Sequence, residues 1–198
     1  MEPLEEIAES LAGQGWAVSR RVYRAEAVES LAAEARRLHA AGEFRRAGIG
    51  RGARREVQEE VRRDEIFWLR QERATAAQAF FWEGVERIRA DLNRLLFLGL
   101  QEFEGHLAVF PPQGFYRRHL DRFSDADERV LSAVLFLNPG WRAEEGGALR
   151  LHLPTGPVDV LPEAGTFAVF RSELIWHEVL PAASPRFSAT GWYRRRTL

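Results

Sequence analysis

Apolar residues in the first half of the chain recur every three or four positions, which is the spacing of helices with one buried face. This spacing predicts three amphipathic helices, over 3–12, 25–41 and 74–98. Gly13 and Gly42 follow the first two segments and are typical helix ends. Short apolar runs at 16–18 and 65–69 predict two strands. Residues 42–63 are rich in arginine and glycine and predict a mobile loop.

The pattern changes after residue 100, where short runs of β-branched, aromatic and leucine residues alternate with proline and glycine turns. These runs predict eight strands, at 103–110, 115–121, 130–138, 148–153, 158–161, 166–171, 174–180 and 186–195. The run 130–138 is apolar on both faces, as expected of a strand inside a two-sheet fold. Helices followed by strands predict an α+β sandwich or barrel, with the helices packed outside it.

The composition limits the number of domains and the kinds of metal site and partner that the protein can have. With 198 residues and 45% hydrophobic side chains, the chain fits one domain with its own core, 1–100 as helical support and 101–198 as the β core. The absence of cysteine excludes disulfides and thiolate metal sites. A net charge of -1 argues against a nucleic-acid partner, and no run of 18 apolar residues suits a membrane span. The acidic segment MEPLEEIAES is unlike a signal peptide, so we expect a cytoplasmic protein.

Two histidines and one carboxylate form the candidate metal site. His119 and Asp121 lie two positions apart in a predicted strand, so both side chains would point to one face. His177 lies in a second predicted strand. Two histidines and a carboxylate are the ligand set of non-haem Fe(II) oxygenases. Arg186 follows and could pair with the far carboxylate of a small dicarboxylic acid bound to the metal.

Taken together, these motifs resemble the 2-oxoglutarate/Fe(II) dioxygenases, in the prolyl 4-hydroxylase branch that includes the hypoxia-type enzymes. The similar blocks are VRRDEIFWL (61–69), FPPQGFYRRHLD (110–121), RVLSAVLFLNPGW (129–141), GGALRLHLP (146–154), WHEVLP (176–181) and RFSATGWY (186–193). The resemblance implies a double-stranded β-helix (jelly-roll) core. It also implies Fe(II) held by His119, Asp121 and His177, with O2 as a reactant and ascorbate as a further expected ligand.

The resemblance implies 2-oxoglutarate as co-substrate, with its distal carboxylate held by Arg186 and Thr190. An apolar slot around its methylene groups would be lined by Leu149, Val134 and Val179. Two residues depart from the family pattern: phenylalanine stands at 110 and 136, where the family has tyrosine. The lost hydroxyl at Phe136 would weaken binding of the co-substrate by about 1.5–3 kcal/mol, unless another group replaces it.

Four further positions match residues near the bound peptide in the hypoxia-type enzymes: Asp64, Arg129, Tyr116 and Trp192. For Asp64 and Arg129 a surface ion pair is the alternative interpretation, and for Trp192 it is a core position. The segment 44–55 falls where that branch has a mobile loop over the substrate, although its arginines would equally suit a solvated loop.

The other histidines are assigned to the framework. His39 lies late in a predicted helix, and His106 and His152 are expected in sheets, with a role beside the metal ligands left open for His152. The predicted activity is hydroxylation of prolyl residues of a protein, with a translation component as the natural substrate class by analogy. A hydroxylase of a small molecule and a non-catalytic metabolite sensor are the alternatives. A nucleic-acid demethylase would usually carry arginine where Trp192 stands.

Overall fold

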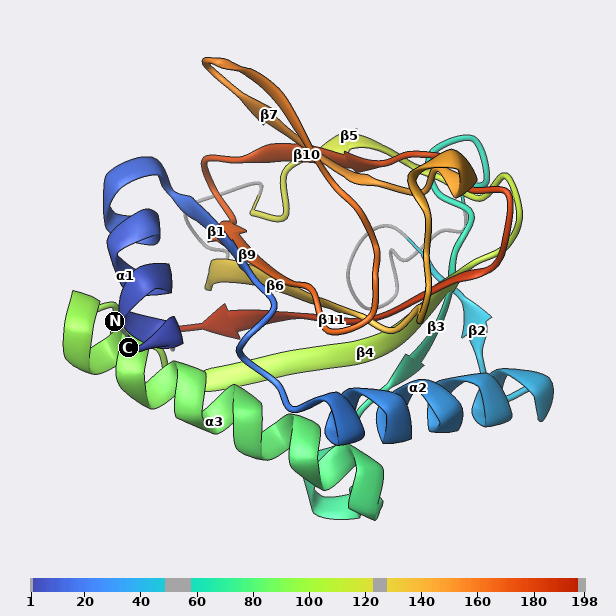
Figure 1. Ribbon diagram of the computed structural model, residues 1–198, viewed down its shortest axis with the longest axis horizontal. Coiled ribbons are helices and arrows are strands. Elements are labelled where there is room, and N and C mark those ends of the chain that lie inside the picture. Colours follow the sequence, from blue (N-terminus) through green and yellow to red (C-terminus); the bar gives the residue numbers. More distant parts are fainter. Residues whose placement is uncertain (1, 49–57, 123–127, 196–198) are drawn as a thin grey trace.

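Two antiparallel sheets face each other, and three helices cover the outer side of the larger sheet (Figure 1). The computed structural model describes residues 2–48, 58–122 and 128–195. The helices are α1 (Pro3–Gln14), α2 (Ala25–Ala40) and α3 (Ala76–Leu96). Two short 3-10 helices are also described, Gln71–Arg73 and Ala143–Glu145. No helix within the described ranges combines the length and the apolar character needed to cross a bilayer.

The larger sheet has the strand order β1-β9-β6-β11-β4-β3-β2, and the smaller has β5-β10-β7-β8. The larger sheet comprises β1 (Trp16–Ser19), β2 (Arg45–Arg46), β3 (Glu65–Trp68), β4 (Glu102–Phe110), β6 (Arg129–Phe136), β9 (Phe167–Arg171) and β11 (Arg186–Arg194). The smaller comprises β5 (Tyr116–His119), β7 (Leu149–Leu153), β8 (Gly156–Val160) and β10 (Trp176–Val179). This arrangement confirms the predicted double-stranded β-helix, and each of the eight strands expected after residue 100 is present.

Strand β6 shows why the run 130–138 is apolar on both faces. Leu131 and Leu135 belong to the core between the larger sheet and the helices, whereas Val134 and Phe136 belong to the core between the two sheets. Alternate residues of a strand point to opposite faces, so one central strand contributes to both cores. The fold is therefore three layers: helices, larger sheet and smaller sheet.

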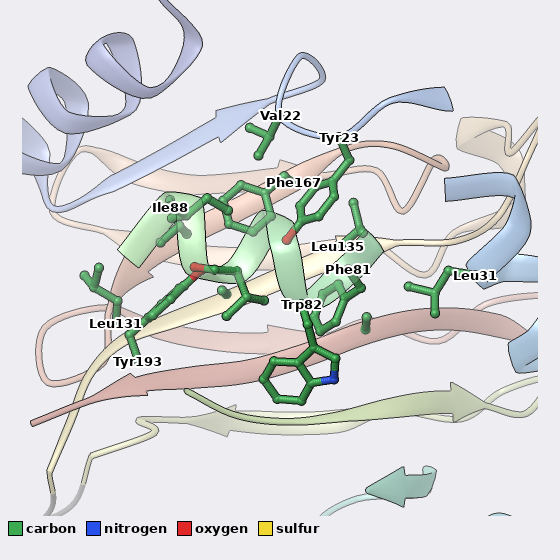
Figure 2. Packing of buried hydrophobic residues seen from close by; sticks show 14 of the residues in the cluster. Val22, Tyr23, Leu31, Phe81, Trp82, Ile88, Leu131, Leu135, Phe167 and Tyr193 are labelled. Atoms are coloured by element: carbon green, nitrogen blue, oxygen red, sulfur yellow. The ribbon is translucent and has the colours of Figure 1, made fainter. Parts of the chain in front are cut away.

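Helix α3 packs its apolar side onto the larger sheet. Phe81, Trp82 and Ile88 of this helix lie in the same buried cluster as Tyr193 of β11 (Figure 2). The Tyr193 hydroxyl donates a hydrogen bond of 3.2 Å to the carbonyl oxygen of Val85. The hydroxyl of this buried tyrosine is therefore satisfied within the core, and Trp82 is buried in the same cluster.

Several boundaries differ from the sequence-based expectation. Helix α1 does not end before Gly13: it continues to Gln14, and Gly15 is its C-cap. The segment predicted as a loop, 42–63, contains β2, which pairs with β3, and Phe44 on its flank is buried; residues 49–57 lie outside the described ranges. The strand predicted over 115–121 ends at His119, and Asp121 follows it in a bend. The expectation that both side chains lie in one strand is therefore wrong for Asp121, although the two side chains still meet, 3.6 Å apart.

Candidate active site

A cavity of about 770 Å³ opens between the two sheets. Its walls come from β3, β4, β6, β9 and β11 of the larger sheet and from β5, β7 and β10 of the smaller sheet. Every residue that the sequence singled out for metal, co-substrate or substrate lines it: Asp64, Tyr116, His119, Asp121, Arg129, Val134, Leu149, His177, Val179, Arg186, Thr190 and Trp192. The fold thus brings together positions that are far apart in sequence.

His119, Asp121 and His177 are buried and offer ligand atoms that all lie within 4.8 Å of one another. The Nε2 atom of His119 is 3.6 Å from Oδ1 of Asp121, and the Nε2 atom of His177 is 3.4 Å from Oδ2. The antiparallel pairing of β5 with β10 sets His119 directly opposite His177. Two imidazoles and one carboxylate at this spacing fit a non-haem Fe(II) ion with open coordination positions.

Both imidazoles are oriented by the backbone. The Nδ1 atom of His119 lies 2.7 Å from the carbonyl oxygen of Arg117, and that of His177 lies 3.1 Å from the carbonyl oxygen of Ile175. A carbonyl oxygen only accepts, so Nδ1 carries the hydrogen in each ring. The Nε2 lone pairs are then free to bind a metal, and the hydrogen bonds hold the rings in place.

The charge states also suit a cation. Burial and then repulsion from His119 lower the pKa of His177 to about 4, so its ring is neutral near pH 7. Burial alone would raise the pKa of Asp121, but His177, His119 and a hydrogen bond from Ser132 outweigh it and hold that pKa well below its usual range. The site therefore presents the carboxylate of Asp121 beside the neutral imidazole of His177.

Arg186 lies at one end of the cavity and is only 2% exposed. Among the described residues its guanidinium makes one hydrogen bond, 2.9 Å from Nε to the carbonyl oxygen of Gly147, and no ion pair. Phe136 and Phe110 face it, with ring centres 4.8 and 5.1 Å from Cζ. Burial lowers the pKa of Arg186 to about 9, a shift that Asp64 partly opposes. A buried cation without an acidic partner fits an anionic ligand at this end of the cavity.

Between Arg186 and the metal ligands the walls are largely apolar. Leu149 and Val179 face each other across the β7–β10 ladder, and Val134 lies opposite Thr190 across the β6–β11 ladder. All four line the cavity. This slot could hold the methylene groups of a dicarboxylic acid whose ends reach the metal and the guanidinium.

A surface ion pair was the alternative interpretation of Asp64 and Arg129. In the structure Asp64 pairs with Arg62, and Arg129 pairs with Glu104. Asp64 is 3% exposed and accepts two hydrogen bonds from Arg62, of 2.7 and 2.6 Å. Arg129 donates to Glu104 at 3.1 Å, and its Cζ lies 3.6 Å from the ring centre of Trp192. The surface interpretation of Asp64 is wrong, because the carboxylate is buried in the cavity wall.

Tyr116 links the metal site to this ion pair. Its ring stacks on that of His119 with centroids 3.6 Å apart, and Cζ of Arg62 lies 4.3 Å from the centre of the Tyr116 ring. Burial raises the pKa of Tyr116 to about 12, so the hydroxyl stays protonated in this setting. The stack fixes the position of a ring that borders the metal ligands.

Several cavity residues were missed from the sequence. Ser132, Trp68 and Arg62 carry no motif of their own, and His106 was assigned to the framework. The signal that could have found His106 is the alternation in β4, which puts Glu104, His106, Ala108 and Phe110 on one face. His152, by contrast, lies 3.0 Å from Glu178 and does not line the cavity.

Comparison with known proteins identifies the family. The chain is 44% identical to a prolyl-4-hydroxylase from Pseudomonas putida whose structure superposes with a TM-score of 0.89, covering 98% of this chain and 100% of that one. The profile described as the 2OG-Fe(II) oxygenase superfamily matches residues 105–194. The chain belongs to this superfamily.

Other relatives lie in the prolyl hydroxylase branch of the superfamily. A prolyl hydroxylase from Trichoplax adhaerens, solved with a fragment of a hypoxia-inducible factor, has a TM-score of 0.86 at 24% identity and shares the fold, covering 96% of this chain and 88% of that one. The hypoxia-inducible factor prolyl hydroxylase of Caenorhabditis elegans is 36% identical over 92 residues, 44% of this chain. The chain spans 13% of the length of this curated relative and 41% of human Egl nine homolog 1. Superfamily members use Fe(II), 2-oxoglutarate and O2, and the donor set described above fits that chemistry.

Proposed function

We propose that this protein hydroxylates prolyl residues of a protein substrate while 2-oxoglutarate is converted to succinate and CO2. One observation carries the proposal: a buried arginine without an acidic partner among the described residues shares a cavity with two histidines and an aspartate. The likeness to the P. putida prolyl-4-hydroxylase supports the choice of proline over other targets.

In this proposal His119, Asp121 and His177 hold Fe(II), and Arg186 with Thr190 binds the distal carboxylate of 2-oxoglutarate. When bound, the ion and the co-substrate supply the chemistry that activates O2. The protein residues position both partners and exclude water: the Nδ1 hydrogen bonds orient the imidazoles, and the apolar slot of Leu149, Val134 and Val179 surrounds the methylene groups. Burial of these groups strengthens every charge interaction between protein and ligand.

The substrate would lie in the same cavity against Asp64, Arg129, Tyr116 and Trp192, of which Trp192 lies opposite Glu104, away from the Arg186 end of β4. The T. adhaerens enzyme was solved with a peptide fragment, which supports a protein substrate here as well. The proposal includes the finer predictions made from the sequence: a component of the translation machinery as the substrate, a cytoplasmic location, and ascorbate as a further ligand.

Mass spectrometry of lysate proteins tests the proposal. Lysate would be incubated with Fe(II), O2, 2-oxoglutarate and either the wild-type protein or His177→Ala. We expect +16 Da shifts on prolyl residues with the wild type alone, accompanied by succinate. Succinate formed together with an oxidised small metabolite, and without any prolyl shift, would favour the small-molecule alternative. Equal succinate from His119→Ala and wild type would contradict the metal assignment.

A further inference from the structure

His106 occupies the middle of the cavity wall, although no motif marks it. Strand pairing sets His106 opposite Trp68 on β3 and opposite Thr190 on β11. Along β4, Phe110 lies nearer the Arg186 end of the cavity and Glu104 lies toward the opposite end. His106 therefore lies beside both the proposed co-substrate position and the proposed substrate position.

Polar atoms of His106 and of its neighbour Trp192 are buried without partners. His106 is 3% exposed, and its Nδ1 atom has no hydrogen-bond partner among the described residues. The Nε1 atom of Trp192 is also buried without a hydrogen-bond partner among the described residues. The ring centres of His106 and Trp192 are 5.6 Å apart. Buried polar groups in native proteins are nearly always hydrogen-bonded. Tyr23 and Trp82 in the hydrophobic core also have such atoms, but His106 and Trp192 are adjacent and line one cavity, where a ligand could supply the missing partners.

The surroundings of His106 favour a neutral, planar ligand group. Burial, then Arg62, lowers the pKa of His106 to about 4, with Arg129 acting in the same direction and Asp64 and Asp121 opposing. The ring is therefore neutral near pH 7 and has one N–H and one lone pair. Trp68 flanks it, with ring centres 5.1 Å apart. Flat aromatic walls and uncharged polar atoms suit a group that is itself flat and uncharged.

An amide group meets these requirements. Its carbonyl oxygen can accept from the indole N–H of Trp192, and its own N–H or oxygen can pair with His106 in either tautomer. We propose that His106 and Trp192 form a subsite for a neutral amide group of the substrate next to the target proline, and that His106 thereby determines substrate specificity. This inference rests on the proposed function. The amide belongs either to the substrate backbone or to an asparagine or glutamine side chain.

Modified peptides test the subsite directly. The probe is the prolyl segment that shows the +16 Da shift in lysate, synthesised in two series. In one series each secondary backbone amide near the proline is replaced in turn by an ester, which removes the N–H and weakens the carbonyl as an acceptor; the amide bond to the proline nitrogen is kept, because that nitrogen is part of the ring. In the other, each asparagine or glutamine is replaced by leucine. The kcat and KM of hydroxylation are measured for the wild type, His106→Leu, His106→Gln and the control His152→Gln.

We expect one peptide change to lower kcat/KM of the wild type about tenfold, mainly through KM. His106→Leu should be about tenfold poorer on the parent peptide and should lose nothing further on the altered one, as expected for two groups that interact. His106→Gln keeps a hydrogen-bonding group and should still discriminate. His152→Gln, altered outside the cavity, should behave as wild type.

Three results would overturn the inference at different points. If His106→Leu discriminates between the peptides as the wild type does, His106 does not contact the amide. If no single amide matters to the wild type, the subsite does not exist, and this result needs no folded variant. If the wild type hydroxylates no prolyl segment at all, the proposed function has failed and the inference fails with it.

Discussion

Ser132 donates a hydrogen bond of 2.6 Å to Oδ2 of Asp121, and its own oxygen lies 2.9 Å from the Ser172 hydroxyl. Both serines are buried, so the pair forms a short chain that fixes the carboxylate of the proposed metal ligand. Removing a residue that hydrogen-bonds a metal ligand typically lowers metal affinity about 10- to 100-fold. Ser132 is thus a positioning residue behind the metal site.

Replacing this serine tests that relationship. We expect Ser132→Ala to weaken Fe(II) binding about tenfold or more in an anaerobic titration. Ser172→Ala removes the outer hydroxyl but leaves the bond to Asp121, so its effect should be smaller. Equal affinity in Ser132→Ala and wild type would show that the backbone alone orients the carboxylate.

Arg186→Met should separate stability from ligand binding. The buried guanidinium has no acidic partner among the described residues, so replacing it with an apolar side chain should leave the ligand-free protein equally stable or more stable. Truncating one partner of a buried charge pair costs roughly 2–5 kcal/mol, so 2-oxoglutarate should bind about 30-fold more weakly or worse. Thermal unfolding with and without 2-oxoglutarate measures both effects. If 2-oxoglutarate raised the melting temperature of Arg186→Met as much as that of the wild type, the distal carboxylate would not bind at Arg186.

Phe136→Tyr should strengthen co-substrate binding. The Phe136 ring lies 4.8 Å from Cζ of Arg186, and a hydroxyl there would add a donor for the distal carboxylate. A hydrogen bond to a charged group contributes about 1.5–3 kcal/mol, so the KM for 2-oxoglutarate should fall about tenfold. An unchanged KM in a variant of wild-type melting temperature would mean that Arg186 and Thr190 already satisfy the carboxylate.

Acid should destabilise the metal-free protein through His106. Its pKa is about 4 in the fold and about 6.5 when unfolded, so the unfolded chain binds more protons between these values and stability falls as pH falls from 6.5 toward 4. Between pH 7 and pH 5 this group contributes a loss of about 2 kcal/mol. Denaturant unfolding at the two pH values should therefore show a smaller loss for His106→Leu than for wild type. Equal losses would mean that His106 is not buried in its neutral form.

Alanine substitutions at Gly84 in α3 and at Gly13 in α1 compare a closely packed helix position with an open one. A Cβ atom at Gly84 would overlap the ring of Tyr23, whereas one at Gly13 meets nothing within 4 Å. Gly13→Ala should stabilise by up to about 1 kcal/mol through helix propensity. Gly84→Ala should destabilise by about 1–3 kcal/mol despite that gain, because overpacking outweighs it. Stabilisation by both would mean that the Tyr23 ring moves aside freely.

Local pattern predicted the strands and brought out the candidate metal ligands, because both depend on spacing along the chain. The continuous apolar run 130–138 and the H-x-D motif at His119 are visible in one segment each. The strand before Asp121 was predicted too long, since a bend two residues from a strand end leaves no apolar signal.

Relations across the sheets could not be predicted in the same way. The bond from Ser132 to Asp121 and the unpartnered Nδ1 of His106 both depend on strand register. The pairing of Asp64 with Arg62 is local, between residues two positions apart, and no motif marked it. Register is set by packing of whole faces, not by the residues concerned. Alternation in β4 indicates that His106 shares a face with Phe110, but not that this face lines a cavity.

Product stoichiometry tests the central claim most directly. The purified protein, Fe(II), O2, 2-oxoglutarate and the prolyl peptide identified from lysate would be combined, and succinate and hydroxyprolyl peptide would be quantified together by mass spectrometry. The proposed function predicts equal amounts of the two products, with neither formed by His177→Ala. Succinate without hydroxyprolyl peptide, or equal products from His177→Ala, would contradict it.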